Sequence, residues 1–151
     1  MIIAFGCDHG GFALREEILA FLKARGDTVL DMGTNSDKAA DYAPYAQKVC
    51  ARVNAGEADF GILVCGTGIG MSLAANKIRG IRCAHVTDTF TAYATRSHND
   101  SNVIALGARV TGPGLALDIL GLFLDTPFSN EERHIRRIEQ ITAIENENCE
   151  G

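Results

Sequence analysis

The chain has 151 residues, of which 46% are hydrophobic, and it carries a formal net charge of −5 with an isoelectric point near 5.3. This length suits a single domain over residues 1–151, and the acidic balance excludes a broad basic surface for nucleic acid. The cysteines are odd in number and form no C-x-x-C pair, which argues against a disulfide framework and a zinc site. The sequence shows neither a signal peptide nor an apolar run near ~18 residues, so we expect a cytoplasmic protein without a membrane partner.

Short apolar runs rich in β-branched residues predict buried strands at residues 2–5, 28–31, 60–64, 82–86 and 103–106. Segments with helical periodicity lie between them, as in the i, i+4, i+8 spacing of Leu14, Ile18 and Leu22. Strands that alternate with helices indicate a parallel sheet covered on both faces, because parallel pairing needs a crossover connection. The expected fold class is α/β, a Rossmann-like three-layer sandwich with a five-stranded parallel sheet.

Two further helices are expected after the last strand. The first covers residues 115–124 and ends before Pro127. Ser129 and Glu132 have the spacing of a capping box, which places the start of the final helix at Ser129. An apolar stripe continues along this helix through Ile135, Ile138, Ile141 and Ile144. A C-terminal helix appended to a complete sheet is a mild indication of contact with a partner subunit.

Polar residues and glycines follow the first and third predicted strands, at the edge where open α/β sheets bind ligands. The segments are Gly6-Cys7-Asp8-His9-Gly10-Gly11 and Cys65-Gly66-Thr67-Gly68-Ile69-Gly70. The glycines of the second segment allow backbone N–H groups to turn toward an anion before a helix expected at residues 71–77. This spacing also occurs in turns that bind nothing, and it fits neither the dinucleotide fingerprint nor the P-loop.

Cys65 stands at the turn from the third strand into the following helix, where the helix dipole and clustered N–H groups favour a thiolate. It is therefore a candidate base, although a cysteine is often only a small buried hydrophobe. We prefer that second interpretation for the other cysteines, which are Cys7, Cys50, Cys83 and Cys149. Thr67 either hydrogen-bonds the Cys65 sulfur or caps the helix.

His9 and His98 lie in polar loop contexts, beside Asp8 and Asn99 respectively. Acid–base, phosphate-binding and structural roles are equally open for this pair of histidines. His85 lies inside a predicted strand, so we expect a packed core histidine there.

The final helix carries His134 and three arginines, Arg133, Arg136 and Arg137. We expect His134 to face solvent or to cap packing. The arginines either bind a phosphate through their guanidinium forks or form a solvated face paired with neighbouring glutamates. Spacing alone does not decide between these alternatives.

Six segments are highly specific when taken together. They are CDHGG (7–11), ADY (40–42), ILVCGTGIGMSLAANK (62–77), GIRCA (80–84), SHNDSNVIALGARV (97–110) and RHIRRIEQI (133–141). With these segments, from residue 1 to about 145, the chain resembles the ribose-5-phosphate isomerase B family, a group that also holds galactose-6-phosphate isomerase subunits. The resemblance implies interconversion of D-ribose 5-phosphate and D-ribulose 5-phosphate through a cis-enediol, with no metal and no organic cofactor.

The same resemblance implies a role for each matching residue. Cys65 would move the proton between carbons 2 and 1, and Thr67 would orient or activate the sulfur. The enediolate oxygens would be bound by the backbone of the 66–70 loop, which comprises Gly66, Thr67, Gly68, Ile69 and Gly70. His98 would open the furanose ring, while the sugar would contact Asp8, Asn99 and Tyr42. The phosphate would be bound by His9, Arg109, Arg133 and Arg137.

The resemblance also implies a homodimer, or a dimer of dimers, whose site draws residues from both subunits, so that a monomer would be inactive. Some members of the family lack the cysteine and carry a carboxylate base six residues further on. Met71 holds that position here, which leaves Cys65 as the candidate base in the loop.

Two departures from the family pattern are Ala43-Pro44, where a proline commonly follows Asp-Tyr directly, and Glu131-Glu132, where a glycine pair is common. The first could reshape the loop near Tyr42. The second places two carboxylates beside Arg133, which could weaken phosphate binding or select among substrates.

Three alternatives remain open at the level of sequence. The first is the same chemistry on a six-carbon sugar phosphate, such as allose 6-phosphate or galactose 6-phosphate, since the sequence does not show the length of the pocket. The second is a phosphosugar sensor without turnover, against which the intact set of Cys65, Thr67 and His98 argues. The third is a redox thiol protein, which ranks last because the chain lacks a C-x-x-C.

Overall fold

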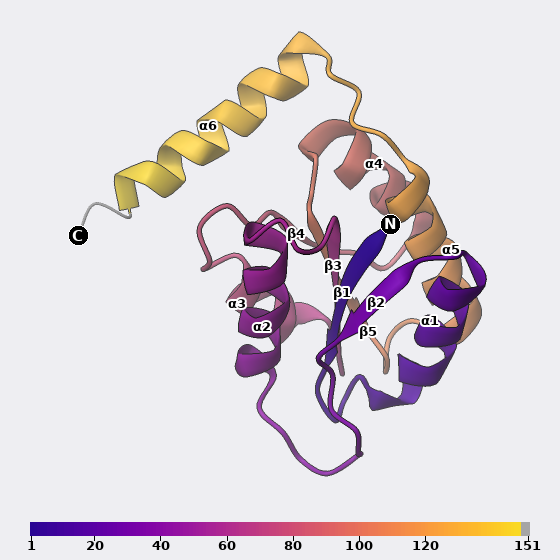
Figure 1. Cartoon of the computed structure of the whole chain (residues 1–151). Helices are drawn as coiled ribbons and strands as arrows, with labels where there is room; N and C mark the ends of the chain where they lie inside the picture. The colour runs from indigo at the N-terminus through magenta and orange to yellow at the C-terminus, as the bar shows by residue number, and fades with distance from the viewer. Residues whose placement is uncertain (149–151) are drawn as a thin grey trace.

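The computed structural model describes residues 1–148 and shows a five-stranded, all-parallel sheet with helices on both faces (Figure 1). The strand order is β2-β1-β3-β5-β4. The strands are β1 (Ile2–Cys7), β2 (Thr28–Asp31), β3 (Phe60–Cys65), β4 (Cys83–His85) and β5 (Val103–Gly107). The helices are α1 (Phe12–Ala24), α2 (Tyr42–Asn54), α3 (Ile69–Ala75), α4 (Thr89–Asn99), α5 (Pro113–Asp125) and α6 (Glu132–Asn148). The α/β class and the parallel five-stranded sheet predicted from sequence are confirmed.

The three central strands are apolar along nearly their whole length because both of their faces are covered. On one face, Phe5, Ile62 and Ile104 pack against side chains of α1, α4 and α5. On the other face, Leu63 and Ala105 pack against α2 and α3. These two apolar clusters form the layers of the three-layer sandwich, in which α1 and α5 lie on the opposite side of the sheet from α2 and α3 (Figure 1).

The expected helix starts need three corrections. Helix α5 begins at Pro113, two residues before the predicted 115, with Gly112 as its N-cap. Helix α3 begins at Ile69, two residues before the predicted 71, because Gly68 adopts a left-handed conformation with φ 82° and serves as the N-cap. Helix α6 begins at Glu132 rather than at Ser129. Asn130 between them is left-handed with φ 55°, which interrupts any helix that starts at Ser129.

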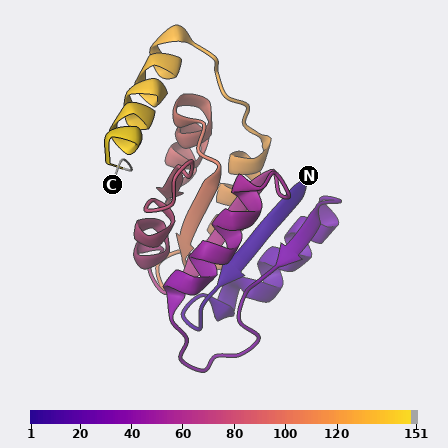
Figure 2. The same cartoon turned by 60° about the vertical axis from the view of Figure 1, so that its left-hand side comes forward.

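Helix α6 forms an arm that the segment after α5 carries away from the sheet (Figure 2). Its one buried residue is His134, in the first turn, whereas Ile135, Ile141 and Ile144 are exposed. The far end returns to the body where Gly80 N–H donates to Glu145 Oε1 at 2.9 Å. Within residues 1–148, no helix is both long enough and apolar enough to cross a membrane.

Candidate functional site

The loops that follow β1 and β3 meet at the carboxyl edge of the sheet. They approach so closely that a Cβ atom on Gly10 would lie 2.7 Å from the backbone nitrogen of Gly66. Asp8 is buried between them, and its Oδ1 accepts a hydrogen bond from Gly11 N–H at 3.0 Å. Glycine at position 10 is therefore required to bring the Asp8 segment against the loop that begins at Cys65.

Cys65 is the last residue of β3, and its side chain is buried with a relative exposure of 5%. The N–H of Gly68 donates to its Sγ at 3.1 Å, a bond that stabilises negative charge on sulfur. The hydroxyl of Thr67 accepts from Ile69 N–H at 3.3 Å, so in this structure it supports the start of α3. Cys65 thus lies in a turn that directs the backbone N–H of Gly68 toward its sulfur.

The other cysteines lie in different surroundings. Burial raises the pKa of Cys7 and of Cys50 to about 11. Burial also raises the pKa of Cys83, with a smaller contribution from nearby Cys50. These thiols remain protonated near neutral pH and are poor bases, in agreement with a packing role. Cys149 lies outside the described residues.

His85 contradicts its expected place in the core. It ends the short edge strand β4 and is exposed, and its Nε2 lies 2.8 Å from the carbonyl oxygen of Thr67. Because a carbonyl can only accept, Nε2 carries the proton and donates it. A Cβ atom on Gly68 would lie 2.7 Å from this ring, so His85 supports the 66–70 loop from outside. The prediction was wrong because the apolar run at residues 82–86 is longer than the strand, and β4 covers only Cys83–His85.

Three more predicted residues reach the same edge. His9 Nδ1 lies 3.1 Å from both the backbone nitrogen and the carbonyl oxygen of Ala40, which ties the ring to the β2–α2 connection. The ring of Tyr42 lies about 3 Å from where a Cβ atom on Gly70 would be, so it covers that glycine. Arg109 N–H donates to Gly66 O at 3.0 Å, and its guanidinium lies beside the same glycine. We call this set the Cys65 group, which comprises Asp8, His9, Tyr42, the 66–70 loop with Cys65, and Arg109.

His98 and Asn99 lie at the opposite, amino edge of the sheet. They end α4, and the turn that follows returns to the start of β3, where Gly61 N–H donates to Asn102 O at 3.0 Å. Gly61 and Cys65 are four residues apart along a strand, which corresponds to about 13 Å. His98 of a chain therefore lies far from Cys65 of the same chain.

The turn after His98 is held by two arginines that the sequence analysis did not single out. Asp100 is left-handed with φ 46°, and its carboxylate accepts from Arg96 Nη1 at 2.8 Å and from Arg82 Nη2 at 3.3 Å. Arg96 is almost fully buried, with its guanidinium over the ring of Phe60. The only signal in the sequence was the SHND segment itself, because a charged residue of α4 and one just before β4 give no indication that they converge.

Arg133 and Arg137 extend from α6 on the side of the molecule that carries His98. Glu131 accepts from Arg133 Nε at 2.8 Å, so one of the two unusual carboxylates does face the guanidinium. Both side chains are more than half exposed, and such pairs contribute little to stability. We call this set the His98 group, which comprises His98, Asn99, Arg133 and Arg137.

His134 is buried, with 3% of its surface exposed, which contradicts the solvent-facing alternative and leaves the packing one. Its ring centroid lies 4.5 Å from that of His98. Burial lowers the pKa of His134, and the nearby charges of His98, Arg133 and Arg137 lower it further, against a smaller opposite effect of Glu131.

This lowered pKa predicts a pH dependence of stability. In the unfolded chain His134 titrates near 6.5, whereas the folded protein keeps it neutral to lower pH. The unfolded state therefore binds more protons as the pH falls through 6.5, and the folded state loses stability. We expect the melting temperature to fall from about pH 8 to about pH 5, and to fall less in His134→Asn, which cannot titrate. Equal slopes for the two proteins would contradict this assignment.

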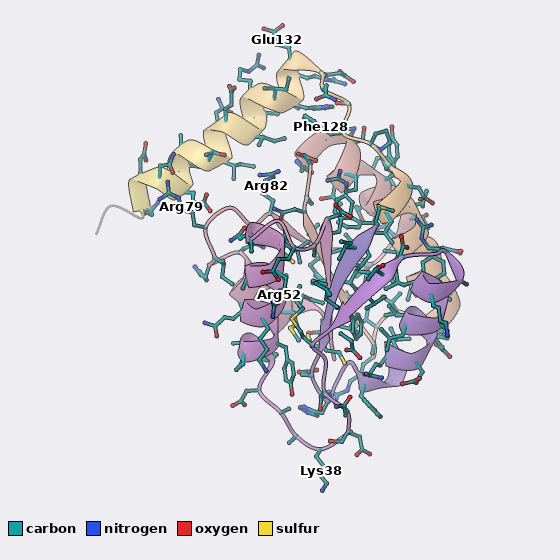
Figure 3. All side chains as sticks on the ribbon, viewed as in Figure 1. Lys38, Arg52, Arg79, Arg82, Phe128 and Glu132 are labelled. Atoms are coloured by element: carbon teal, nitrogen blue, oxygen red, sulfur yellow. The ribbon has the colours of Figure 1, made fainter. Side chains whose placement is uncertain are left out.

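The two groups lie at opposite ends of the molecule. In Figure 3, Lys38 of the connection that contacts His9 marks one end, and Glu132, the neighbour of Arg133, marks the other. Within one chain, the residues of the Cys65 group lie together and the residues of the His98 group lie together. The two groups are far from each other. Within residues 1–148, no cluster of three or more histidine, cysteine, aspartate or glutamate side chains is placed to hold a metal ion.

Comparison with known proteins gives consistent results. A family profile described as Ribose/Galactose Isomerase matches residues 3–141. Ribose-5-phosphate isomerase B of Escherichia coli K12 is 50% identical over 143 residues, which are 95% of each chain. The structure of ribose-5-phosphate isomerase B from Clostridium thermocellum superposes with a TM-score of 0.95 at 47% identity, over 98% of this chain and 99% of the other. The enzyme from Mycoplasma genitalium with bound ribulose 5-phosphate has a TM-score of 0.91 at 36% identity, with 97% of each chain covered.

Proposed function

Since this chain belongs to the ribose/galactose isomerase family, and is thus an aldose–ketose isomerase of sugar phosphates, we propose that its substrates are D-ribose 5-phosphate and D-ribulose 5-phosphate. The single observation that carries the mechanism is the environment of Cys65, a buried thiol at a strand end that accepts a hydrogen bond from Gly68 N–H. The relative from Mycoplasma genitalium, with bound ribulose 5-phosphate, supports the choice of a five-carbon substrate.

In the proposed reaction, the Cys65 thiolate takes the proton from carbon 2 of the open-chain aldose. The electron pair of the broken C–H bond forms the C1–C2 double bond, and negative charge develops on the oxygen at carbon 1. Backbone N–H groups of the 66–70 loop stabilise that charge, which appears only as the reaction proceeds. The oxygen at carbon 1 is then protonated, and the hydroxyl at carbon 2 loses its proton. Cys65 returns its proton to carbon 1, and the product is the ketose.

Each site in this proposal combines the Cys65 group of one subunit with the His98 group of a second copy. The support is the separation of the two groups within a chain, since β3 alone places the turn near Asn102 and the sulfur of Cys65 at opposite edges of the sheet. His98 would open the furanose ring by acid–base transfer, and Arg133 and Arg137 would bind the phosphate together with His9 and Arg109.

The surface around α6 supports a second copy as the partner. A cavity of about 840 Å³ opens between α6 and the segment from α3 to β4, and its lining includes Ile141, Ile144 and Asn99. Exposed isoleucines beside a residue of the His98 group are typical of a surface that another protein covers. We therefore assign this region to the dimer interface. We also propose a cytoplasmic location, in keeping with the free thiols of Cys7, Cys50, Cys65 and Cys83.

The experiment that tests the substrate is a comparison of kcat/KM for ribose 5-phosphate, allose 6-phosphate and galactose 6-phosphate, each measured in the presence of a chelator. We expect ribose 5-phosphate to be preferred at least tenfold, a difference of about 1.4 kcal/mol in transition-state binding. A preference for either six-carbon substrate would move the assignment to the alternative isomerase. Binding of all three without turnover would indicate a sensor.

A further inference from the structure

His134 contacts His98 across a stacked pair of rings, with centroids 4.5 Å apart and planes inclined by 32°. The two residues belong to α6 and α4, helices that meet near the start of α6. His134 is also the one buried residue of α6 and lies next to Arg133 in sequence. It therefore stands between the residue proposed to open the sugar ring and the residues proposed to bind the phosphate.

The hydrogen bonds around His134 fix the orientation of its ring. Ser129 Oγ accepts from Glu131 N–H at 3.3 Å and lies 2.6 Å from His134 Nδ1. The serine hydroxyl can donate its proton to Nδ1 or accept one from it, and in either case the contact fixes the orientation of the imidazole ring. Ser129 N–H also donates to Ser97 O at 3.0 Å, which ties this arrangement to the residue before His98.

We propose that His134 is a positioning residue for the ring-opening step: its neutral ring, oriented by Ser129, stacks on His98 and holds that imidazole in the orientation for proton transfer to the sugar. This inference rests on the proposed function, and it adds a residue that the sequence analysis had assigned to solvent or to packing. His134 acts through His98 and does not itself contact the substrate.

The charges around the pair explain why a neutral ring suits this place. His98 faces His134 from α4, while Arg133 and Arg137 of α6 and Glu131 of the preceding segment are the other charged groups near it. The edge of the Tyr93 ring packs against the His98 ring with centroids 6.3 Å apart. A second imidazolium here would repel the cation that His98 becomes when it accepts a proton. Neutral His134 instead offers a π face to that cation.

The test separates ring opening from isomerisation. Ribose 5-phosphate enters as a furanose and needs ring opening, whereas ribulose 5-phosphate has no hydroxyl placed to close a furanose ring. Exchange of the carbon-1 proton of ribulose 5-phosphate with deuterated solvent therefore reports the Cys65 chemistry without the His98 step. In His134→Ala, we expect turnover of ribose 5-phosphate to fall about tenfold. This is a part of the roughly 10²- to 10⁴-fold effect of acid–base catalysis, because His98 remains present but less well oriented. Exchange of the carbon-1 proton should stay within about twofold of wild type.

Two matched variants define what His134 supplies. His134→Phe keeps an aromatic ring against His98 but loses the hydrogen bond to Ser129, and Ser129→Ala keeps His134 and removes the hydroxyl. Both are expected to lose less turnover than His134→Ala. An equal loss of turnover and exchange in His134→Ala would show that the residue only holds α6 in place. Unchanged turnover would show that the contact with His98 does not contribute to catalysis. Either result would overturn the proposal.

Failure of the proposed function gives a different result, since wild type itself would then show neither turnover nor exchange. The contact remains testable by NMR titration of the His134 ring proton in the absence of substrate. Because the charge of His98 contributes to the lowered pKa of His134, His98→Asn is expected to raise its titration midpoint. An unchanged midpoint would count against the coupled pair whatever the reaction proves to be.

Discussion

Replacement of Cys65 by alanine is expected to lower kcat for ribose 5-phosphate by roughly 10³-fold or more, because no other side chain in the 66–70 loop can take the carbon-bound proton. Met71, six residues after Cys65, has no basic group and is fully buried. Deuterium exchange at carbon 1 of ribulose 5-phosphate should fall by the same factor, since it depends on the same proton transfer. Both rates are measured on purified variant, with circular dichroism as the check of folding.

Cys50→Ala is the matched control. Cys50 is fully buried in the cluster beneath α2, and its pKa is raised to about 11, so it should make no catalytic contribution. We expect turnover within about twofold of wild type and a small loss of stability from the lost packing, on the order of 1 kcal/mol. Activity that survives Cys65→Ala, or that vanishes equally in Cys50→Ala, would refute the assignment of the base.

The sheet could be predicted from sequence because each central strand is a continuous apolar run with helical periodicity on either side. Ile62 and Leu63 point to opposite faces, and both are fully buried. The exception was β4, where an edge strand of three residues replaced the five expected, and His85 accordingly lies outside the core. Edge strands are covered less completely than central ones, so an apolar run gives weak information about where they end.

The helix starts depended on backbone conformations that residue type alone does not determine. Gly68 was recognised as part of a turn, but its role as the N-cap of α3 follows from its left-handed φ. Asn130 is also left-handed, so a helix cannot run through it from Ser129, and the capping-box prediction was wrong. The hydroxyl of Ser129 is directed to His134 instead of capping α6, a long-range contact that no local pattern indicates.

The Cys65 group could be predicted because parallel strands all end at one edge, so residues after β1, β3 and β5 must converge there. Asp8, Cys65 and Arg109 do so. That rule does not predict where His98 lies relative to Cys65, because His98 lies at the end of a helix and not of a strand. A helix that follows a strand runs back toward the amino edge, and the site predicted as one cluster is therefore two groups in the chain.

This division makes a complementation experiment decisive. Cys65→Ala and His98→Ala should each be nearly inactive on ribose 5-phosphate as separate proteins. In a heterodimer of one chain of each kind, one site combines the intact Cys65 of one subunit with the intact His98 of the other, while the second site contains both substitutions. Heterodimer isolated by two different affinity tags is therefore expected to show about half of wild-type kcat, since a twofold dimer has two equivalent sites.

The inverse pairing provides the control. A chain that carries both substitutions is joined to a wild-type chain, and each shared site then contains one substitution, so activity should be lost. If each chain instead had a complete site of its own, this heterodimer would retain about half of the activity and the complementing pair would show none. The two pairings contain the same substitutions in the same numbers, so a difference in stability or expression cannot produce opposite results. Only the placement of Cys65 and His98 on different subunits of one site predicts activity in the first pairing and its loss in the second.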